Sequence, residues 1–417
     1  MKNLLFILGA YYPNYSANGL CCKNIIDECV KRGYNVYCIS NATKLQSKIY
    51  AHDGVEIFPI KPKFITAVYN WTLEKRNSKI RKILYEVLTY LNKIKLLLMS
   101  RIWPLTSYSY SNRFYKKAKM VCNKKHIDVV ITAYTPFEAL YAGYKLKRKY
   151  SNLTFIPYYL DALYGGWGPS IWSKEKINRH TNYWENKIDS IADLIISMES
   201  VKSFHCLNND LFKNKRYYLD VPTLKKYDYD ICKTKKNNKY TFVFAGAIQY
   251  PRRNPIPILN LFLELSKKID IEVEFIGNCN NQKIFDYYTS ESNNRIKLVG
   301  EISHDEILKK ELNADFLINI GSVNANTIPC KIFEYMIFHK PIISTYSIDN
   351  EPSIEYLKKY GNVFFIDERK KIEEYEEPLK AFIINATNNS NNGNIYDIFY
   401  KNTPGAFVNL IMEKLEK

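Results

Sequence analysis

Short apolar runs alternate with helical patterns along this chain in two series separated by a polar break. In the first series, strand-like runs lie at 4–8, 36–40, 128–133, 153–160 and 194–198, and helical patterns at 20–31 and 136–149. In the second, strand-like runs lie at 240–245, 271–276, 296–299, 316–320 and 341–345, and helical patterns at 256–268, 304–312 and 332–338. Alternation of this kind predicts the α/β class, with parallel sheets covered by helices on both faces.

The position of the break predicts two domains. A chain of 417 residues is long enough for more than one core. Val221-Pro222 ends the first series, and the following stretch is polar without an apolar period. We expect a first domain at 1–223, a linker at 224–239, a second domain at 240–395, and a terminal helix at 396–417 that crosses back to the first. Two such domains place a ligand in a cleft that faces the carboxyl ends of the strands.

The composition excludes several classes of protein. Hydrophobic residues make up 46% of the chain and charged residues 24%, which excludes wholesale disorder. No apolar run reaches the roughly 20 residues of a membrane span, and the run at 4–10 ends at Tyr11 and Tyr12, as a strand would, without a signal cleavage site. The 9 Cys are scattered, so we expect a reducing cytoplasm rather than a disulfide or zinc framework.

The net charge of +18 predicts a surface that attracts anions. The densest basic stretch, 61–125, contains apolar residues at three- and four-residue spacing that predict a basic amphipathic helix at about 78–103. Two interpretations stay open: a helix packed on its own domain, or a helix at an anionic membrane surface. No RNA-binding signature is present, so nucleic acid ranks last among the partners.

The segment 328–343 contains the most informative pattern. Lys331 and Glu334 lie three residues apart near the start of an expected helix and therefore share one face. A helix start beside a Lys suits a phosphate, and a Glu can accept two hydrogen bonds from ribose hydroxyls. The alternative is an ordinary ion pair on the protein surface.

Several segments together resemble the retaining nucleotide-sugar glycosyltransferases of the GT-B fold (family 4-like, in the cell-surface polysaccharide branch). The first is Ile328-Pro-Cys-Lys-Ile-Phe-Glu-Tyr-Met-Ile-Phe-His-Lys-Pro-Ile-Ile343. The others are Phe244-Ala-Gly-Ala-Ile-Gln-Tyr-Pro-Arg-Arg-Asn-Pro255, Ile296-Lys-Leu-Val-Gly-Glu-Ile-Ser303, Ala314-Asp-Phe-Leu-Ile-Asn-Ile320, Ala192-Asp-Leu-Ile-Ile196, and Tyr12-Pro13 with Ser16 and Gly19. The resemblance covers nearly the whole chain and implies two Rossmann-like domains that face a cleft.

The resemblance also implies a donor site. Arg253, with Lys331, would neutralise the diphosphate of a UDP- or GDP-sugar, so that no metal or other cofactor is required. If the alignment of this segment with the family shifts by one residue, Arg252 takes this role instead. Glu334 would hold the ribose. The remaining donor-binding positions that it implies are Gly19, Gly246, Val299, Gly300, Ile302 and Asn326. Many relatives have a glutamate where Asn326 stands, so the resemblance is incomplete there.

The acceptor side is less specific. Asp161, at the end of an expected strand, either orients or deprotonates an acceptor hydroxyl or caps the following turn. Glu138 is a weaker candidate, and in these relatives the leaving phosphate itself is thought to accept the proton. Asp228-Tyr-Asp230 matches a metal-binding Asp-x-Asp, but its place in the polar linker indicates chance.

The predicted activity is retaining transfer of a sugar to a glycan or to a polyprenyl-diphosphate-linked acceptor, in capsule, O-antigen or lipopolysaccharide assembly. We expect the protein at the cytoplasmic, inner face of the plasma membrane. A sugar-nucleotide epimerase of the same architecture, a non-catalytic partner subunit and a basic membrane-surface scaffold are the alternatives.

Overall fold

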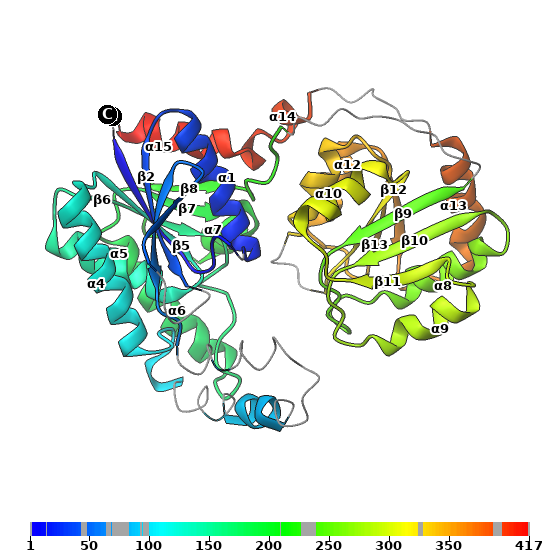
Figure 1. The fold of residues 1–417 in the computed structure, drawn as a ribbon, viewed down its shortest axis with the longest axis horizontal. Helices are drawn as coiled ribbons and strands as arrows, with labels where there is room; N and C mark the ends of the chain where they lie inside the picture. The colour runs from blue at the N-terminus through cyan, green and yellow to red at the C-terminus, as the bar shows by residue number, and fades with distance from the viewer. Residues whose placement is uncertain are drawn as a thin grey trace. The chain divides into compact units, whose positions relative to one another are not determined.

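The computed structural model of the protein describes residues 2–13, 15–42, 48–63, 68, 83–91, 94, 100–208, 210–226, 239–323, 328–386 and 394–415. The chain divides into two compact units, Met1–Pro222 with Thr403–Lys417, and Thr223–Asn402. Each unit contains its own sheet of largely parallel strands with helices packed on it (Figure 1). The predicted α/β class with two Rossmann-like sheets is confirmed.

The first unit has an eight-stranded sheet in the order β3-β4-β2-β1-β5-β6-β7-β8. Its strands are β1 (Asn3–Ile7), β2 (Asn35–Asn41), β3 (Tyr50–His52), β4 (Val55–Ile60), β5 (Val129–Tyr134), β6 (Thr154–Tyr159), β7 (Ile195–Met198) and β8 (Arg216–Leu219). Only the β3–β4 pair is antiparallel within the described strands. The order reverses between β1 and β5, so their carboxyl ends flank a point where an open sheet can bind a ligand.

The helices of this unit are α1 (Ala17–Lys31), α4 (Tyr108–Lys125), α5 (Phe137–Lys149), α6 (Lys174–Asp189), α7 (Lys202–Leu207) and α15 (Pro404–Leu415), with 3-10 turns η1 (Ser100–Ile102) and η2 (Glu199–Val201). Helices α4 and α5 pack together on the sheet, and α1 packs against β2 and α15. Phe114 and Ala118 of α4 join Leu5 and Ile7 of β1 in one buried cluster. The core therefore depends on the apolar face of each helix meeting the apolar run of a strand.

The second unit repeats the architecture with a six-stranded sheet, ordered β11-β10-β9-β12-β13-β14 and parallel throughout its described pairs. Its strands are β9 (Tyr240–Ala245), β10 (Ile271–Ile276), β11 (Ile296–Gly300), β12 (Phe316–Ile320), β13 (Ile342–Tyr346) and β14 (Val363–Asp367). Its helices are α8 (Ile256–Ser266), α9 (Lys283–Glu291), α10 (His304–Asn313), α11 (Lys331–Ile337), α12 (Ser353–Tyr360), α13 (Glu373–Asn385), α14 (Ile395–Ile398) and the 3-10 turn η3 (Tyr400–Asn402).

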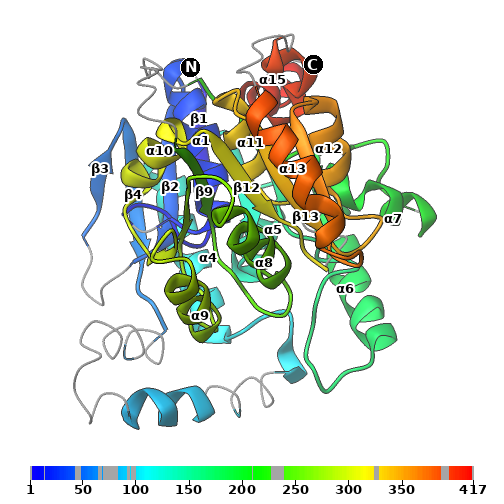
Figure 2. The same cartoon turned by 90° about the vertical axis from the view of Figure 1, so that its right-hand side faces the viewer.

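Helices α8, α9 and α13 pack together over this second sheet, and Figure 2 shows them toward the viewer, while α11 packs against α12. Phe242, Phe262 and Phe316 fill the core beneath α8. The strand order reverses between β9 and β12. The loops that follow these two strands, at 246–255 and 321–330, therefore start from neighbouring positions at the carboxyl edge of the sheet.

Three predicted segments differ from the structure or lie partly beyond what it describes. The predicted single helix at 396–417 is wrong: α14 and η3 end before Pro404, and α15 begins there, because proline can start a helix but cannot donate a hydrogen bond within one. Of the predicted helix at 78–103, the described residues 83–91 and 94 are helical, and Ser100–Ile102 form the 3-10 turn η1. Of the predicted linker, 227–238 lie outside the described residues, and Asp228-Tyr-Asp230 lies there too.

No helix within the described part of the chain is both long enough and apolar enough to cross a bilayer.

Candidate functional site

The strongest candidate site lies at the carboxyl edge of the second sheet, where α11 begins. Ile328 and Pro329 come shortly before α11, and Lys331 and Glu334 occupy the first turn of that helix. The backbone N–H of Ala245, at the end of β9, donates to the buried Tyr335 hydroxyl oxygen at 3.0 Å. This bond fixes α11 against the point where the strand order reverses.

Lys331 and Glu334 contact one another as their spacing predicts. Lys331 Nζ lies 2.7 Å from Glu334 Oε2 and donates to Glu311 Oε1 of α10 at 2.9 Å. The Lys331 side chain is 26% exposed and that of Glu334 7%. The predicted alternative of an ordinary surface pair does not fit this degree of burial.

The charges of the two carboxylates decide the state of Lys331. Burial works against its charged form, but Glu334 and Glu311 outweigh burial and raise the pKa of Lys331. An ammonium has three N–H donors, so the two carboxylates leave one donor for a further acceptor. Lys331 is therefore charged and able to donate to an anion without releasing either partner.

Arg253 lies in the loop that follows β9. Its guanidinium Nη1 donates to the Ala247 carbonyl oxygen at 3.5 Å, across the turn that contains Gly246. Burial, followed by the nearby charge of Arg252, lowers the pKa of Arg253, while Glu351 works in the opposite direction. Because a guanidinium stays charged in spite of such a shift, the loop holds a partly desolvated cation.

Arg252 differs from its neighbour. Its side chain is exposed, and its carbonyl oxygen accepts a hydrogen bond from the Val323 N–H at 3.2 Å. This backbone bond joins the loop after β9 to the loop after β12. Of the two arginines, Arg253 has the environment that fits anion binding, and Arg252 contributes its backbone to the shape of the site.

The residues expected to hold the base lie at the end of β11. Gly300 has a φ of +86°, a conformation that favours glycine, and Val299 and Gly300 border a polar hollow of about 760 Å³ against α9. Lys331, Glu334 and Arg253 do not line this hollow. Ile302, two residues further on, is half-buried in the loop that leads into α10.

His304, the first residue of α10, connects this loop to Glu334. Its Nε2 lies 3.9 Å from Glu334 Oε1, and partial burial lowers the pKa of His304. Ser303 and Glu306 form a reciprocal capping box at the start of α10. The capped helix thus carries both His304 and Glu311 toward Glu334 and Lys331.

Glu311, His304 and Glu351 were not among the predicted site residues. Glu351 follows β13, accepts a hydrogen bond from the Ser353 N–H at 3.0 Å, and has its pKa raised by burial. No local pattern marks Glu311 and His304, because their contacts join α10 to α11. The sequence offers one signal for Glu311: the glutamate lies in an expected helix, next to the apolar residues that face the sheet.

In the first unit, a small polar group gathers at the carboxyl edge of the sheet. Asn18 Nδ2 of α1 donates to Asp161 Oδ2 at 2.7 Å and to the Tyr134 carbonyl oxygen at 3.4 Å. These residues follow β1, β5 and β6, which are neighbours around the point where this sheet reverses its order. Asp161 is exposed, so its carboxylate faces solvent with one oxygen oriented by Asn18.

The predicted glycines have different surroundings. A Cβ at Gly19 would lie 2.0 Å from the Ala10 carbonyl oxygen, so glycine is required there by packing inside the unit. A Cβ at Gly246 would meet Phe244 at 3.4 Å, an ordinary contact. Asn326 lies outside the described residues.

Glu138 lies within the interior of the first unit. Its side chain is fully buried, and Oε1 accepts hydrogen bonds from the Thr106 N–H at 2.8 Å and from the Thr106 hydroxyl. The carboxylate thus holds the loop before α4.

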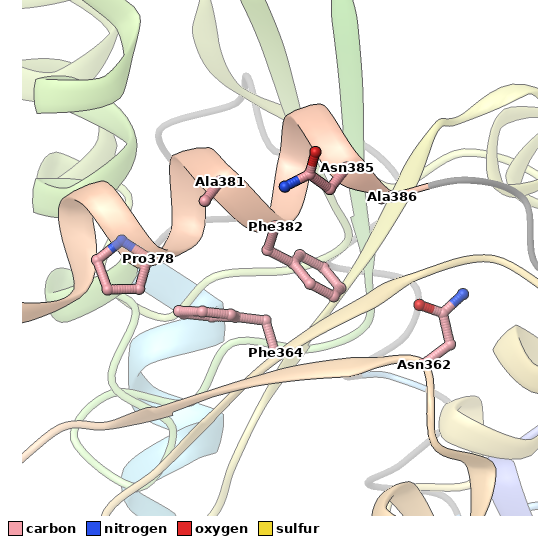
Figure 3. A pocket seen from close by; sticks show the side chains of 7 residues that line it. All are labelled: Asn362, Phe364, Pro378, Ala381, Phe382, Asn385 and Ala386. Carbon is pink, nitrogen blue, oxygen red and sulfur yellow. The ribbon is translucent and has the colours of Figure 1, made fainter.

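A second hollow, of about 450 Å³, lies at the opposite edge of the second sheet. Figure 3 shows that Pro378, Ala381, Phe382 and Asn385 of α13 face Phe364 of β14 and Asn362 just before it. Asn362 marks the amino end of β14, whereas Lys331 and Glu334 lie at the carboxyl end of β12. This apolar groove is therefore separate from the candidate site.

No protein-family model matches this sequence, and neither does any curated protein. Solved structures do match over nearly the whole chain. The structure of Anabaena Alr3699/HepE in complex with UDP and glucose has a TM-score of 0.60 at 13% identity and covers 100% of both chains. The apo lipopolysaccharide outer core galactosyltransferase WaaB has a TM-score of 0.54 at 11% identity over 99% of both chains.

A UDP-GlcNAc 2-epimerase from Methanocaldococcus jannaschii is also similar, with a TM-score of 0.55 at 14% identity over 99% of both chains. These similarities show that the chain has the GT-B fold. The epimerase and the galactosyltransferase WaaB both match this fold, so the fold alone does not distinguish the two activities.

Proposed function

We propose that this protein is a glycosyltransferase that moves a sugar from a nucleoside-diphosphate donor to a glycan or lipid-linked acceptor in cell-surface polysaccharide synthesis. The observation that carries the proposal is the buried Lys331–Glu334 pair at the reversal point of the second sheet. Glycosyltransferases with the same fold support it, one of them bound to UDP and glucose and another acting in lipopolysaccharide synthesis.

In the proposed donor complex, Glu334 accepts hydrogen bonds from the ribose hydroxyls through its carboxylate. Arg253 and the third N–H of Lys331 bind the diphosphate. Cations fixed in a partly desolvated site stabilise the charge that develops on the diphosphate as the sugar leaves, because they need not reorganise during the reaction. We propose UDP or GDP as the leaving nucleotide.

We further propose that the sugar is transferred with retention. The neutral Asn326 can hydrogen bond a sugar hydroxyl but supplies no carboxylate to react at the anomeric carbon. A leaving phosphate that accepts the acceptor's proton needs no such carboxylate. Asp161, oriented by Asn18, is the proposed group for positioning an acceptor hydroxyl.

The proposed acceptor is glycan- or polyprenyl-diphosphate-linked at the inner face of the plasma membrane. Within the predicted amphipathic helix at 78–103, five apolar side chains are exposed. They are spaced close to one and two helical turns apart: Ile83, Val87, Tyr90, Leu91 and Ile94. Arg81, Lys82, Lys93 and Lys95 surround them in sequence. Apolar and basic residues in this combination favour contact with an anionic membrane surface.

A thermal-shift panel with UDP, GDP, ADP and CMP tests the donor site. We expect one nucleoside diphosphate to raise the melting temperature of the full chain, and E334A to remove most of that rise. E264A is the matched control, because Glu264 and Lys267 form an exposed i,i+3 pair with the same 2.7 Å separation. A panel without any shift would contradict the proposal.

The epimerase is the second candidate, since a UDP-GlcNAc 2-epimerase has this fold. Incubation of the protein with the sugar nucleotide alone separates the two activities. An epimerase converts the donor into an isomeric sugar nucleotide without an acceptor, whereas a transferase releases nucleoside diphosphate at a rate that depends on the acceptor. A chain that does neither, and that binds nucleotide weakly or not at all, would behave as a non-catalytic partner subunit.

A further inference from the structure

Glu311 is the second carboxylate that contacts Lys331, beside Glu334, which the proposed donor complex assigns to the ribose. It belongs to the last turns of α10, and its Oε1 accepts a hydrogen bond from Lys331 Nζ at 2.9 Å. Its side chain is fully buried, and its Oε2 has no hydrogen-bond partner among the described residues. A buried carboxylate with one unsatisfied oxygen is costly in its charged form.

The charges around Lys331 do not balance. Two carboxylates, Glu311 and Glu334, share one ammonium, so the group has a net charge of −1 when all three are ionised. Burial is the main cause that raises the pKa of Glu311, to about 8, and the charge of Glu334 adds to it while Lys331 opposes it. Near neutral pH, Glu311 is therefore the member of this group that holds or releases a proton.

The other groups around Glu311 are unsuited to that role. Tyr335 on α11 has its pKa raised by burial and by Glu311 itself, and His304 on α10 has its pKa lowered by burial. Strand β9, which also packs against α10, has Tyr240 as its titratable residue, and this ring packs on Phe316 in the core. The neighbouring Lys310 is directed to Glu274 of β10.

We propose that Glu311 is a proton-linked counter-ion of the diphosphate site, which positions Lys331 and, in the molecules where it is ionised, takes up a proton from solvent when a diphosphate binds. The inference rests on the proposed function of Lys331. A diphosphate beside Lys331 brings negative charge toward Glu311, and like charge favours the neutral carboxylic acid. Protonation makes Glu311 neutral, so that the positive charge of Lys331 then interacts with the bound anion and Glu334 alone.

Isothermal titration of UDP into the full chain at pH 8, in buffers with different ionisation enthalpies such as HEPES and Tris, tests this linkage. At a pH equal to the pKa of free Glu311, half of the molecules already hold the proton, so uptake approaches about 0.5 proton per UDP. UDP itself contributes little proton uptake at pH 8, because the second pKa of a phosphate is about 6 and its terminal phosphate is therefore already ionised.

The matched variants are E311Q and E274Q. E311Q removes the titrating group while keeping an oxygen for Lys331, and we expect its proton uptake to fall close to zero. E274Q changes a carboxylate of β10 that pairs with Lys297 of β11 and Lys310 of α10 and forms no ion pair with Lys331 among the described residues, and we expect uptake equal to that of the wild type. Uptake by E311Q equal to that of the wild type would overturn the inference.

A second measurement needs no variant. Because binding takes up a proton, the affinity of the wild type for UDP should fall as the pH rises from 8 to 9.5; an affinity that stays constant overturns the inference. UDP binding without any buffer-dependent heat also overturns it and leaves the proposed function intact. If neither UDP nor GDP binds, the proposed function fails and the inference fails with it.

Discussion

At the scale of single residues, the environment of Lys331 explains how a cation can remain charged and available in a half-buried position. Glu334 and Glu311 hold its ammonium from two sides at 2.7 and 2.9 Å. The spacing of Lys331 and Glu334 could be predicted from the sequence because an i,i+3 contact is local to one helix. Glu311 could not, because it lies 20 residues away on another helix and its approach depends on the packed sheet.

Arg253 and Arg252 provide a residue-scale prediction. R253A should weaken binding of the preferred nucleoside diphosphate by roughly 10- to 100-fold, as expected for the loss of a charge-assisted hydrogen bond. R252A should have a much smaller effect, because its exposed side chain is not needed for the Val323 contact that its carbonyl makes. Titration calorimetry on both variants measures the two affinities. A larger loss of affinity in R252A than in R253A would assign the phosphate contact to Arg252.

The raised pKa of Glu311 predicts how stability depends on pH. In the unfolded chain a glutamate releases its proton near pH 4.3, whereas in the folded protein Glu311 holds its proton up to about pH 8. The folded state therefore binds more protons over this interval, and Glu311 makes the protein less stable as the pH rises through it.

E311Q removes this dependence. The melting temperature of E311Q minus that of the wild type should thus increase from pH 5 to pH 8, in the absence of nucleotide. A difference that stays flat or decreases over this range would show that Glu311 is ionised throughout.

At the scale of helices and strands, a buried ionic network holds the edge of the first sheet. Arg216 of β8 contacts Asp189 of α6 at 2.6 Å, Asp210 at 2.7 Å and Glu185 at 3.3 Å. Glu185 Oε2 also accepts the Tyr164 N–H at 2.8 Å, in the loop that follows Asp161. The network therefore connects the proposed acceptor loop to α6 and β8.

R216M should lower the free energy of unfolding of the first unit by about 3–5 kcal/mol, because Asp189 and Asp210 lose the cation that pairs with them, while Glu185 keeps its contact with His205. Urea unfolding monitored by tryptophan fluorescence measures this, since all five Trp residues of the sequence, at 71, 103, 167, 172 and 184, belong to the range of the first unit. R369M is the control, because Arg369 forms half-exposed ion pairs in the second unit and should change stability little. A small effect of R216M would indicate that the carboxylates become neutral without cost.

The elements that the sequence predicted best are the buried strands. The expected strands at 240–245, 271–276 and 316–320 agree with β9, β10 and β12 to the residue. The first and last are mostly apolar runs that the helices cover, and β10 alternates apolar residues with Glu272 and Glu274, the period of two that marks a strand. Helix α13 was not predicted, since it contains Pro378 and begins with acidic residues. The edge strands β3, β8 and β14 were missed as well, because they are short or only partly buried.

At the scale of the whole molecule, the chain consists of two units with separate cores, and its last helix belongs to the first of them. Phe407 of α15 packs against Tyr158 of β6 with ring centroids 4.8 Å apart. The sequence predicted the two-sheet plan because the alternation of strands and helices occurs twice. It could not predict that the candidate site would include α10, whose Glu311 and His304 meet α11 only in the folded second unit.

Hydrogen exchange of the full chain, with and without a saturating nucleoside diphosphate, tests the central claim most directly, because it locates the bound ligand. The account predicts that protection increases in peptides covering 246–253, 299–304 and 328–337, and that E334A abolishes the increase. Protection confined to the groove at 362–386, or found only in the first unit, would contradict the claim that Lys331, Glu334 and Arg253 bind the nucleotide.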